Sequence, residues 1–427
     1  MKIYRIEANL LAPLALKRDR QSDRSETVRS IPGTTVRGAL ANAYLQQHGE
    51  VDSVFHRLFL DEAHCRFGPL DPGPHFFPAT VSACKRFSKD HPKVDQLWFR
   101  AAQHLTGNCL AESVHQRFRQ CHVCGTDMKG HVGFWEHRDS QIAERDDEQH
   151  QVSAHVGIDR GTFTAADGMF YTLEAIAPRD DAYDLIGWIQ LTDDARLDLD
   201  RLLHEEVGVV YLGHHRTRGY GKVRLTIGED NLGDGMADNQ SGGWQQWSDA
   251  MIQFVRDVCV TSDAESTTDR RRTVALSASR DFLFSISLPD GAILVDHLLR
   301  YTADPAAMID WLPPLPDPAR LFPVDERLAA ALPGGGTLQC VAAVTNEQLL
   351  RGWNAAHGLP RQDEWMVARG SVYVYRFQGS QEDRGDLHRR LTELAAAGIG
   401  LRRNEGYGRI AVSDPIHSTL ALQETPQ

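Results

Sequence analysis

Hydrophobic and polar positions along the chain follow strand and helix periods in short, separated segments. Residues 2–10 alternate loosely between apolar and polar side chains, which is the period of a half-buried strand. Residues 36–44 carry an apolar stripe at helical spacing, directly after the turn-like residues 31–35. The same patterns predict further strands and helices at residues 169–176, 201–207, 244–258, 274–288, 371–377 and 387–397. Because strands and helices do not alternate regularly, we expect an α+β fold.

Breaks in this pattern predict the domain organisation. Residues 228–243 contain five glycines among acidic residues and asparagines, which is typical of a linker. Residues 63–133 are dense in Pro, Gly, Cys and His and poor in periodic apolar positions, so we expect an insertion there without a core of its own. The sequence therefore predicts a first domain at 1–227 that carries this insertion, a linker, and a second domain at 244–427.

An internal repeat lies near the end of each half of the chain. Residues 213–223 read GHHRTRGYGKV and residues 400–410 read GLRRNEGYGRI, with Arg216 and Arg403 in register. Both segments fit Gly-x5-Gly-Tyr-Gly-(Lys/Arg)-(Val/Ile), and the fixed separation indicates two related domains.

The repeated loop has the chemistry of a polyanion site. Glycines permit positive φ, basic side chains beside bare backbone N–H groups bind anions, and tyrosine offers a stacking face for a base. Residues 213–225 hold four basic residues and no acidic ones, although the formal net charge of the chain is −12. That net charge excludes a protein that is basic over its whole surface, but it does not exclude a local basic patch. The alternative is a tight hairpin with a solvated charged face.

A second candidate anion site is the helix start at residues 32–38. Helix N-termini present free N–H groups, and the threonines add hydroxyl donors. The alternative here is an ordinary capped helix start.

Three motifs resemble those of the CRISPR-associated RAMP superfamily. Residues 31–38 (IPGTTVRG) resemble its Ile-Pro-Gly-Ser-Ser-Leu-(Arg/Lys)-Gly signature, and the two Gly-Tyr-Gly segments resemble its C-terminal glycine-rich loops. Residues 156–171 are similar to its Ile-Asp-Arg…Gly…Leu-(Phe/Tyr) stretch. The length, the doubled architecture and the cysteine-bearing insertion look most like the Csx-class RAMP subunit of type III-D effector complexes. The second half of the chain lacks a counterpart of the Pro-Gly-Thr-Thr segment.

The resemblance implies two ferredoxin-like (RRM-like) domains, the first with a Cys/His-rich insertion. It also implies a non-catalytic crRNA-binding subunit that caps the repeat-derived 5′ handle end of the guide RNA. The implied protein partners are a polymerase-like large subunit and backbone RAMP subunits, with target RNA as an indirect partner. The side chains expected to bind RNA are Arg29, Thr34, Thr35, Arg37, Arg216, Arg218, Tyr220, Lys222, Arg402, Arg403, Tyr407 and Arg409.

We expect no catalysis, because the sequence contains no P-loop, nucleophile elbow or His-Glu-x-x-His motif. The first alternative is a RAMP ribonuclease that cuts repeat or target RNA, with Asp19, Asp23, His48 or His56 placed against a 2′-OH. The second is a zinc-bearing scaffold that contacts only proteins. No apolar run reaches the ~20 residues of a membrane helix and no signal peptide is recognisable, so we expect a cytoplasmic protein.

Five of the seven cysteines fall between residues 65 and 124. Cys121 and Cys124 form a Cys-x2-Cys knuckle, whose two thiolates can reach one tetrahedral ion. A metal would stabilise an insertion that lacks a periodic core. The sequence therefore predicts a structural zinc bound by Cys84, Cys109, Cys121 and Cys124. Either of the two ligands outside the knuckle, Cys84 or Cys109, could be replaced by Cys65, His122 or His131. The alternative is a set of reduced thiols without metal.

Overall fold

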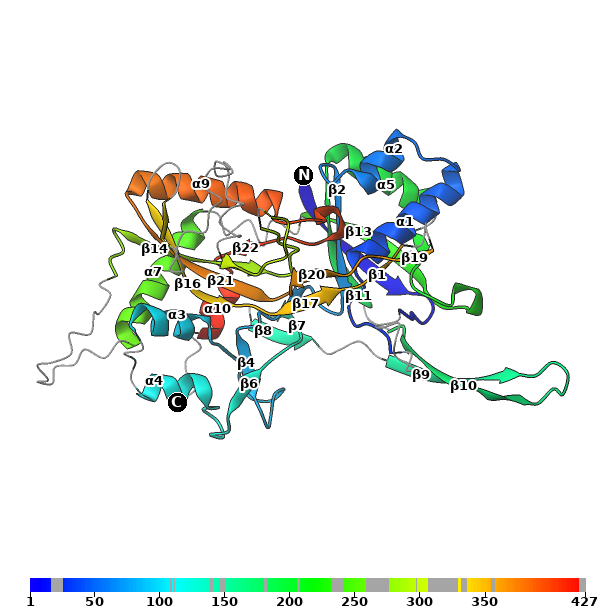
Figure 1. Cartoon of the computed structure of the whole chain (residues 1–427), viewed down its shortest axis with the longest axis horizontal. Coiled ribbons are helices and arrows are strands. Elements are labelled where there is room, and N and C mark those ends of the chain that lie inside the picture. The colour runs from blue at the N-terminus through cyan, green and yellow to red at the C-terminus, as the bar shows by residue number, and fades with distance from the viewer. Residues whose placement is uncertain are drawn as a thin grey trace, which may run out of the picture. The chain divides into compact units, whose positions relative to one another are not determined.

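The computed structural model divides into two compact units (Figure 1). Unit 1 comprises Met1–His75, Gly133–Met236 and Asn404–Gly406, and unit 2 comprises Phe76–Val132, Ala237–Arg403 and Tyr407–Gln427. The residues that the structure describes are 1–16, 26–107, 110, 112–138, 141–145, 150–179, 183–205, 208–231, 241–258, 276–296, 298–305, 329–331, 336–354 and 358–421.

Unit 1 contains a five-stranded antiparallel sheet with the strand order β12-β13-β1-β11-β2. The expected first strand lies at its centre. The strands are β1 (Lys2–Leu10), β2 (Cys65–Asp71), β11 (Leu185–Leu191), β12 (Val209–Tyr211) and β13 (Lys222–Asn231). Helix α1 (Gly33–His48) lies between β1 and β2 in the chain, and α5 (Asp193–Glu205) lies between β11 and β12.

Helix α1 contributes its apolar stripe to the core of unit 1. Val36, Leu40, Ala43 and Tyr44 are buried, which confirms the face predicted from their spacing. The N-cap residue is Pro32, and no side chain caps the helix. Since the helix begins at Gly33, Thr34 and Thr35 lie inside its first turn. It ends at Gly49, whose positive φ of 78° suits a glycine. The short helices α2 (Ser53–Phe55) and η1 (His56–Leu60) add Phe55, Leu58 and Phe59 to the same core.

A long β-hairpin in unit 1 lies outside the main sheet. Its strands β9 (His150–Ile158) and β10 (Ala165–Ile176) form a two-stranded sheet, which a bridge from Ile176 to Leu14 ties to the chain after β1, and they are labelled at the lower right of Figure 1. Leu173 and Ala175 are buried at its base, whereas much of its remaining length is exposed. A second hairpin is formed by β7 (Phe134–Arg138) and β8 (Gln141–Arg145), and β3 comprises His75–Phe76.

Unit 2 repeats the strand order of unit 1. Its sheet has the strand order β15-β16-β21-β14-β22. Four strands correspond between the units: β1, β2, β11 and β13 in unit 1, and β14, β16, β21 and β22 in unit 2. In each unit the first of these four lies between the third and the last. The strands are β14 (Asp281–Leu288), β15 (Ala329–Ala331), β16 (Thr337–Val344), β21 (Ser371–Gln378) and β22 (Ala411–Val412). Between β16 and β21 the chain forms four further short strands, β17 (Glu347–Leu350), β18 (Trp353–Asn354), β19 (Leu359–Pro360) and β20 (Glu364–Val367).

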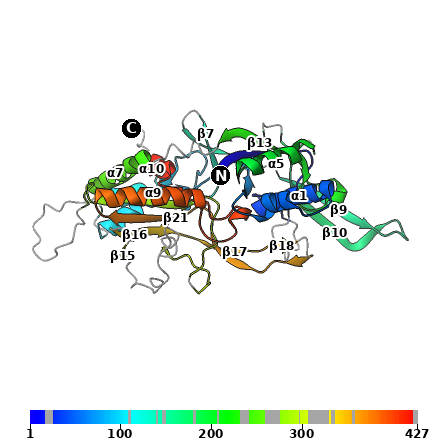
Figure 2. The ribbon, with the colours of Figure 1, turned by 90° about the horizontal axis from the view of Figure 1, so that it is seen from above.

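Strand β14 is buried at all eight positions because helices cover both faces of its sheet. One face packs on α9 (Gln381–Ala397), which lies alongside β21 in Figure 2. The opposite face packs on α7 (Ser241–Val258) and α3 (Leu97–Leu105). Helix α9 begins at a capping box formed by Ser380 and Asp383, six residues before the predicted start at 387, and its C-cap is Gly398.

Residues 63–133 differ from the expectation of a coreless insertion. Strand β2 belongs to the main sheet of unit 1, and α3 buries Leu97, Trp98 and Phe99 in the core of unit 2. The pattern was misread because a helix of nine residues shows fewer than three turns of periodicity. The other elements here are β4 (Val81–Cys84), β5 (Val94–Asp95), α4 (Glu112–Arg119) and β6 (Met128–Gly130).

The remaining parts of the chain need only brief mention. The central part of the predicted linker, residues 232–240, lies outside the described residues. Helix α10 (Pro415–Ala421) follows β22. Among the described residues, no helix is both long and apolar enough to cross a membrane.

A fully buried hydrogen-bonded chain links α10 to the rest of unit 2. His417 Nδ1 lies 2.6 Å from Asp95 Oδ2, and His417 Nε2 lies 2.9 Å from Ser287 Oγ. Burial disfavours the imidazolium, but the charge and hydrogen bond of Asp95 outweigh it and raise the pKa of His417. The order Ser-His-Asp resembles a hydrolytic triad. However, Ser287 is only 4% exposed within β14, so a substrate cannot reach it. These three hydrogen-bonded side chains therefore have a structural role.

We predict that this pair makes the stability of unit 2 depend on pH. Asp95→Asn should reduce the free energy of unfolding by about 3–5 kcal/mol, because it leaves a buried imidazole without its counter-charge. Since the folded pKa of His417 is raised, its contribution is complete below the unfolded value near 6.5 and is lost as pH rises through the folded pKa. Urea unfolding at several pH values should show this loss.

His417→Gln is the second variant of this experiment and should lack that part of the pH dependence. His104→Gln, at an exposed position of α3, is the control and should retain it. The same pH profile in the parent chain and in His417→Gln would contradict the prediction.

Candidate nucleic-acid interface and metal centre

The first glycine-rich loop has a backbone that few residues other than glycine can adopt. Gly213, Gly219 and Gly221 have φ values of 72°, 86° and 79°, and His215 also lies in the left-handed region, before the turn η2 (Arg216–Arg218). A Cβ on Gly221 would lie 2.0 Å from the carbonyl oxygen of Leu212. The glycines therefore fix both the loop conformation and the close backbone approach.

The second loop repeats this backbone almost residue for residue. Gly400, Gly406 and Gly408 have φ values of 73°, 94° and 80°, and Arg402 takes the left-handed place of His215 before η4 (Arg403–Glu405). The closing hydrogen bonds also match: the N–H of Leu212 donates to Gly221 and that of Ile399 donates to Gly408, both at 2.8 Å. The sequence repeat thus extends to the loop geometry.

The two loops differ in their charge environment. The basic side chains of Arg216 and Arg218 in the first loop, and of Lys222 and Arg224 at the start of β13, extend into solvent. In the second, Arg402 pairs with Glu364 at 2.8 Å and Arg409 pairs with the buried Asp290 at 2.6 Å. The first loop therefore presents its positive charge to solvent, whereas these two arginines of the second loop are neutralised inside unit 2.

The first loop contacts the middle of the β9–β10 hairpin through polar side chains. Arg218 donates to the Tyr171 hydroxyl, and the Tyr171 ring stacks on His155 at 5.2 Å between centroids. The hydroxyl oxygens of Ser153 and Tyr220 lie 3.1 Å apart. Burial, then the charge of Arg218 and of His155, lowers the pKa of His215. These contacts connect the loop to the hairpin.

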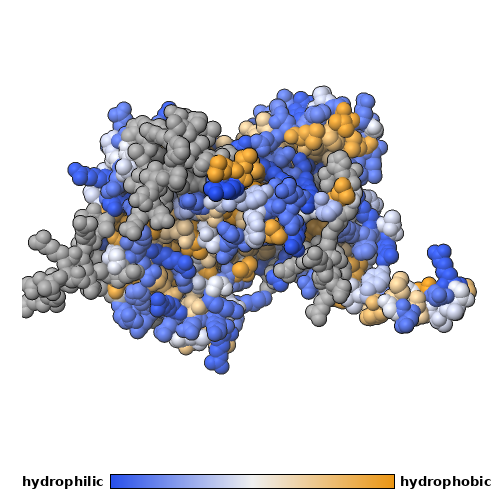
Figure 3. Space-filling model, viewed as in Figure 1, coloured by the Kyte–Doolittle hydropathy of each residue, from blue (hydrophilic) through white to orange (hydrophobic). Residues whose placement is uncertain are grey.

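Two of these residues, His155 and Tyr171, are absent from the predicted site. The motif at 156–171 carried a signal for them, because it covers Tyr171 and begins beside His155. Tyr220 was expected to offer a stacking face, but its ring packs on Ala15, Leu173 and Ala175. Exposed aromatic rings are found instead on the hairpin, whose surface carries apolar atoms at the lower right of Figure 3.

The predicted helix-start site is more enclosed than the first loop. Thr34 and Thr35 are half-buried, and Arg29 before them is exposed. Arg37 donates to Glu405 Oε1 at 2.8 Å and to the Phe59 carbonyl at 3.0 Å. The guanidinium of Arg37 is therefore held within unit 1.

Two other predicted RNA contacts, Arg403 and Tyr407, are half-buried in the second loop. Of the residues named for possible cleavage, His48 is the last residue of α1, and its ring centroid lies 4.2 Å from that of Tyr44. His56 is exposed in η1. Asp19 and Asp23 lie outside the described residues.

A cluster of four ligand atoms in unit 2 could hold a metal ion. Cys84, His91, Cys121 and Cys124 offer atoms that all lie within 4.8 Å of one another. The Sγ atoms of Cys84 and Cys124 are 3.6 Å apart, and His91 Nδ1 lies 3.2 Å from Cys121 Sγ. Ligands about 2.3 Å from a tetrahedral ion stand about 3.8 Å apart, so the spacing fits such an ion.

Three of the four predicted ligands meet in this cluster, and His91 joins them. Cys109 lies outside the described residues, and the proposed substitute Cys65 is buried in the sheet of unit 1. His91 was missed because it stands thirty residues before its neighbour Cys121, and no spacing rule links the two. Its approach depends on the loop between β4 and β5.

The thiols of the cluster differ in acidity. Hydrogen bonds from the side chain and backbone of Thr126 lower the pKa of Cys124 to about 6. Burial raises the pKa of Cys121. A metal binds the thiolate form, so Cys124 is already prepared as a ligand, whereas Cys121 would release its proton when the ion binds.

The fold and the two glycine-rich loops agree with the family comparison. The RAMP superfamily matches residues 10–224, which is half of the chain and includes the first loop. The chain belongs to the RAMP superfamily. No curated protein matches the sequence.

Several solved structures resemble the chain weakly. A type III-B Cmr-beta structure bound to cognate target RNA is 10% identical, covers 95% of this chain and 96% of its own, and has a TM-score of 0.37. Oligomeric Cmr4 from Pyrococcus furiosus is 14% identical over 53% of this chain and 98% of its own, with a TM-score of 0.23.

Proposed function

We propose that this chain is a non-catalytic crRNA-binding subunit of a type III, III-D-like CRISPR effector complex. In this role it caps the repeat-derived 5′ handle end of the guide RNA. The observation that carries the proposal is the first glycine-rich loop with the start of β13, which together expose four basic residues in a RAMP chain of net charge −12. Such a local excess of positive charge in an acidic protein favours a specific phosphate contact over general adhesion.

The β9–β10 hairpin adds groups that suit single-stranded RNA. Phe163 is 84% exposed and Phe170 is 68% exposed, so both rings are available for stacking on bases. The first loop is hydrogen-bonded to the middle of this hairpin through Arg218 and Tyr171. We therefore assign phosphate binding to the loop and base contact to the hairpin.

We propose that each unit contains one ferredoxin-like RAMP domain. The shared strand order, with the first strand between the third and the last, is the order of that fold. The helix after the third strand is present in both units as α5 and α9. The Csx-class assignment and the association with a polymerase-like large subunit and backbone RAMP subunits belong to the same proposal, with target RNA reached through the guide.

The proposed phosphate contacts of the first loop predict a loss of RNA affinity when its arginines are removed. Arg216→Ala combined with Arg218→Ala should weaken binding of repeat-derived guide RNA about tenfold or more. It should also reduce the steepness of the salt dependence by about 1.4, because two phosphate contacts to a single strand are lost. Filter binding at several salt concentrations measures both quantities.

Two control variants make this experiment specific. Arg138→Ala with Arg201→Ala removes the same charge from unit 1, at side chains that are 70% and 75% exposed, and should have little effect. Arg402→Ala with Arg409→Ala should also affect the salt slope less, because both arginines are already ion-paired. An unchanged affinity and slope in the first variant would disprove the assignment of the loop.

We further propose that the Cys/His cluster holds a structural zinc. Three thiolates and one imidazole are a common zinc set, and four protein ligands leave no open position for catalysis. Zinc bound there would tie β4 to the segment before β6.

The zinc proposal predicts about one zinc per chain in protein purified without added metal. Cys121→Ser with Cys124→Ser should abolish the metal, and His91→Ala should lower its retention during dialysis against a chelator. Cys109→Ser and Cys340→Ser are matched controls and should keep the metal. A folded, protease-resistant segment 63–133 in a metal-free preparation would refute the proposal.

The non-catalytic role predicts that the purified chain leaves RNA intact. Labelled repeat RNA and guide-complementary RNA should both survive incubation with and without divalent metal, and gel electrophoresis provides the measurement. Cleavage that disappears in Asp19→Ala, Asp23→Ala or His48→Ala would instead identify the chain as a RAMP ribonuclease.

A further inference from the structure

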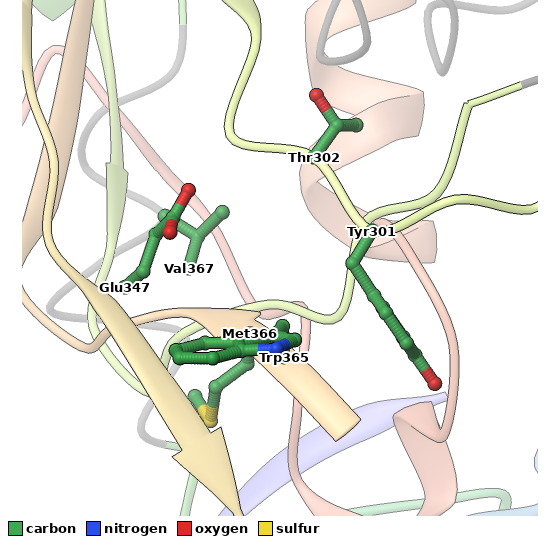
Figure 4. A pocket seen from close by; sticks show the side chains of 6 residues that line it. All are labelled: Tyr301, Thr302, Glu347, Trp365, Met366 and Val367. Carbon is green, nitrogen blue, oxygen red and sulfur yellow. The ribbon is translucent and has the colours of Figure 1, made fainter. Parts of the chain in front are cut away.

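A small cavity in unit 2 combines open aromatic rings with one carboxylate. It measures about 150 Å³ and is lined by Tyr301, Thr302, Glu347, Trp365, Met366 and Val367 (Figure 4). In the β17–β20 pair, Glu347 stands opposite Val367 and Leu349 opposite Trp365, so Glu347 and Trp365 are diagonal neighbours on one face. Trp365 is 49% exposed and Tyr301 is 37% exposed, so the cavity is open to solvent.

Three ion pairs involve residues on the chain segments that adjoin the lining of this cavity. Arg402 binds Glu364 at 2.8 Å, Arg300 binds Asp296 at 2.7 Å, and Arg351 lies 3.5 Å from Asp363. Glu347 is different, because its exposed carboxylate has no ion pair or side-chain hydrogen bond among the described residues. Within the part of the chain that the structure describes, the Glu347 carboxylate at this cavity is therefore not neutralised, and its charge repels phosphate and attracts a cation.

A tight turn next to the cavity presents two leucines to solvent. Leu298 is 60% exposed and Leu299 is 78% exposed, and Leu299 has a positive φ of 59°, which is rare for a branched residue. The Asp296 carboxylate fixes the turn by accepting from the backbone N–H of Leu298 and of Arg300 at 2.8 and 3.0 Å. The turn leads directly into Tyr301, which bridges back to Val295.

We propose that this cavity is a docking site for an arginine side chain of a protein partner. The guanidinium stacks on the Trp365 indole and pairs with the Glu347 carboxylate, while apolar side chains of the same partner cover Leu298 and Leu299. A planar guanidinium suits an aromatic face and a carboxylate at once. The space is sufficient, since a cavity of this size in an engineered protein accepts benzene.

A protein partner fits these observations better than RNA does. Burial of exposed aliphatic side chains against another apolar surface is favourable. A strand of RNA would bring phosphates toward Glu347, whereas the exposed basic residues for phosphate lie on the first loop, in unit 1. This inference goes beyond the proposed RNA contacts, because it concerns a different surface and a protein side chain in place of phosphates and bases.

The test uses the full chain labelled with 5-fluorotryptophan, with the Trp365 resonance assigned by its disappearance in Trp365→Phe. The probes are acetyl-Gly-Arg-Gly-amide, the same peptide with neutral citrulline in place of arginine, and a single-stranded twelve-nucleotide RNA, a length within the range of about 4–16 nucleotides bound per site by single-strand binders. We expect the arginine peptide to shift the Trp365 resonance saturably. The citrulline peptide should bind at least about fivefold more weakly, as expected for loss of a charge-assisted pair.

Two variants separate this site from the RNA surface. Glu347→Gln keeps the shape of the side chain and should weaken the arginine peptide by a similar factor, with RNA affinity unchanged. Arg216→Ala with Arg218→Ala should leave the peptide titration unchanged. Equal binding of the arginine and citrulline peptides, or a shift of the Trp365 resonance by RNA that exceeds that by the arginine peptide, would overturn the proposal.

Discussion

At the end of each glycine-rich loop two backbone segments approach each other closely, and this contact constrains how the loop and the following strand are placed. A Cβ on Gly221 would stand 2.0 Å from the Leu212 carbonyl, and one on Gly408 would stand 1.8 Å from that of Ile399. Any other residue must push the two backbones apart, and the hydrogen bonds that close the loops would be lost. This contact sets the entry into the last strand of each sheet and the direction of the loop side chains. The same backbone then carries exposed charge in one unit and paired charge in the other.

Local sequence patterns predicted the features that depend on local physics. The loop repeat needs positive φ at fixed glycine positions, and both copies show it. The strand at residues 2–10 and the apolar face of α1 follow from side-chain periodicity alone. The pairing of Arg402 with Glu364 and of Arg409 with Asp290 could not be predicted in this way, because each acid reaches its arginine through tertiary folding.

The metal cluster shows the same division between local and long-range information. The Cys-x2-Cys knuckle is local, and its two cysteines do meet one another and Cys84. The fourth partner depends on how the chain between β4 and β5 folds back, so His91 could not be chosen over other histidines by spacing. The buried pair of His417 and Asp95 was likewise invisible, since 322 positions separate its members.

Helix α3 has a consequence for the order in which the chain is made. Its apolar residues pack on a sheet whose first strand begins only at Asp281, although the helix itself ends at Leu105. At the usual speed of synthesis, the ribosome needs on the order of ten seconds to a minute to add the missing strands. During that interval Leu97, Trp98 and Phe99 lack the surface that buries them. Unit 2 therefore cannot complete its core during translation until most of the chain has emerged, and its N-terminal segment must wait in a partly folded form.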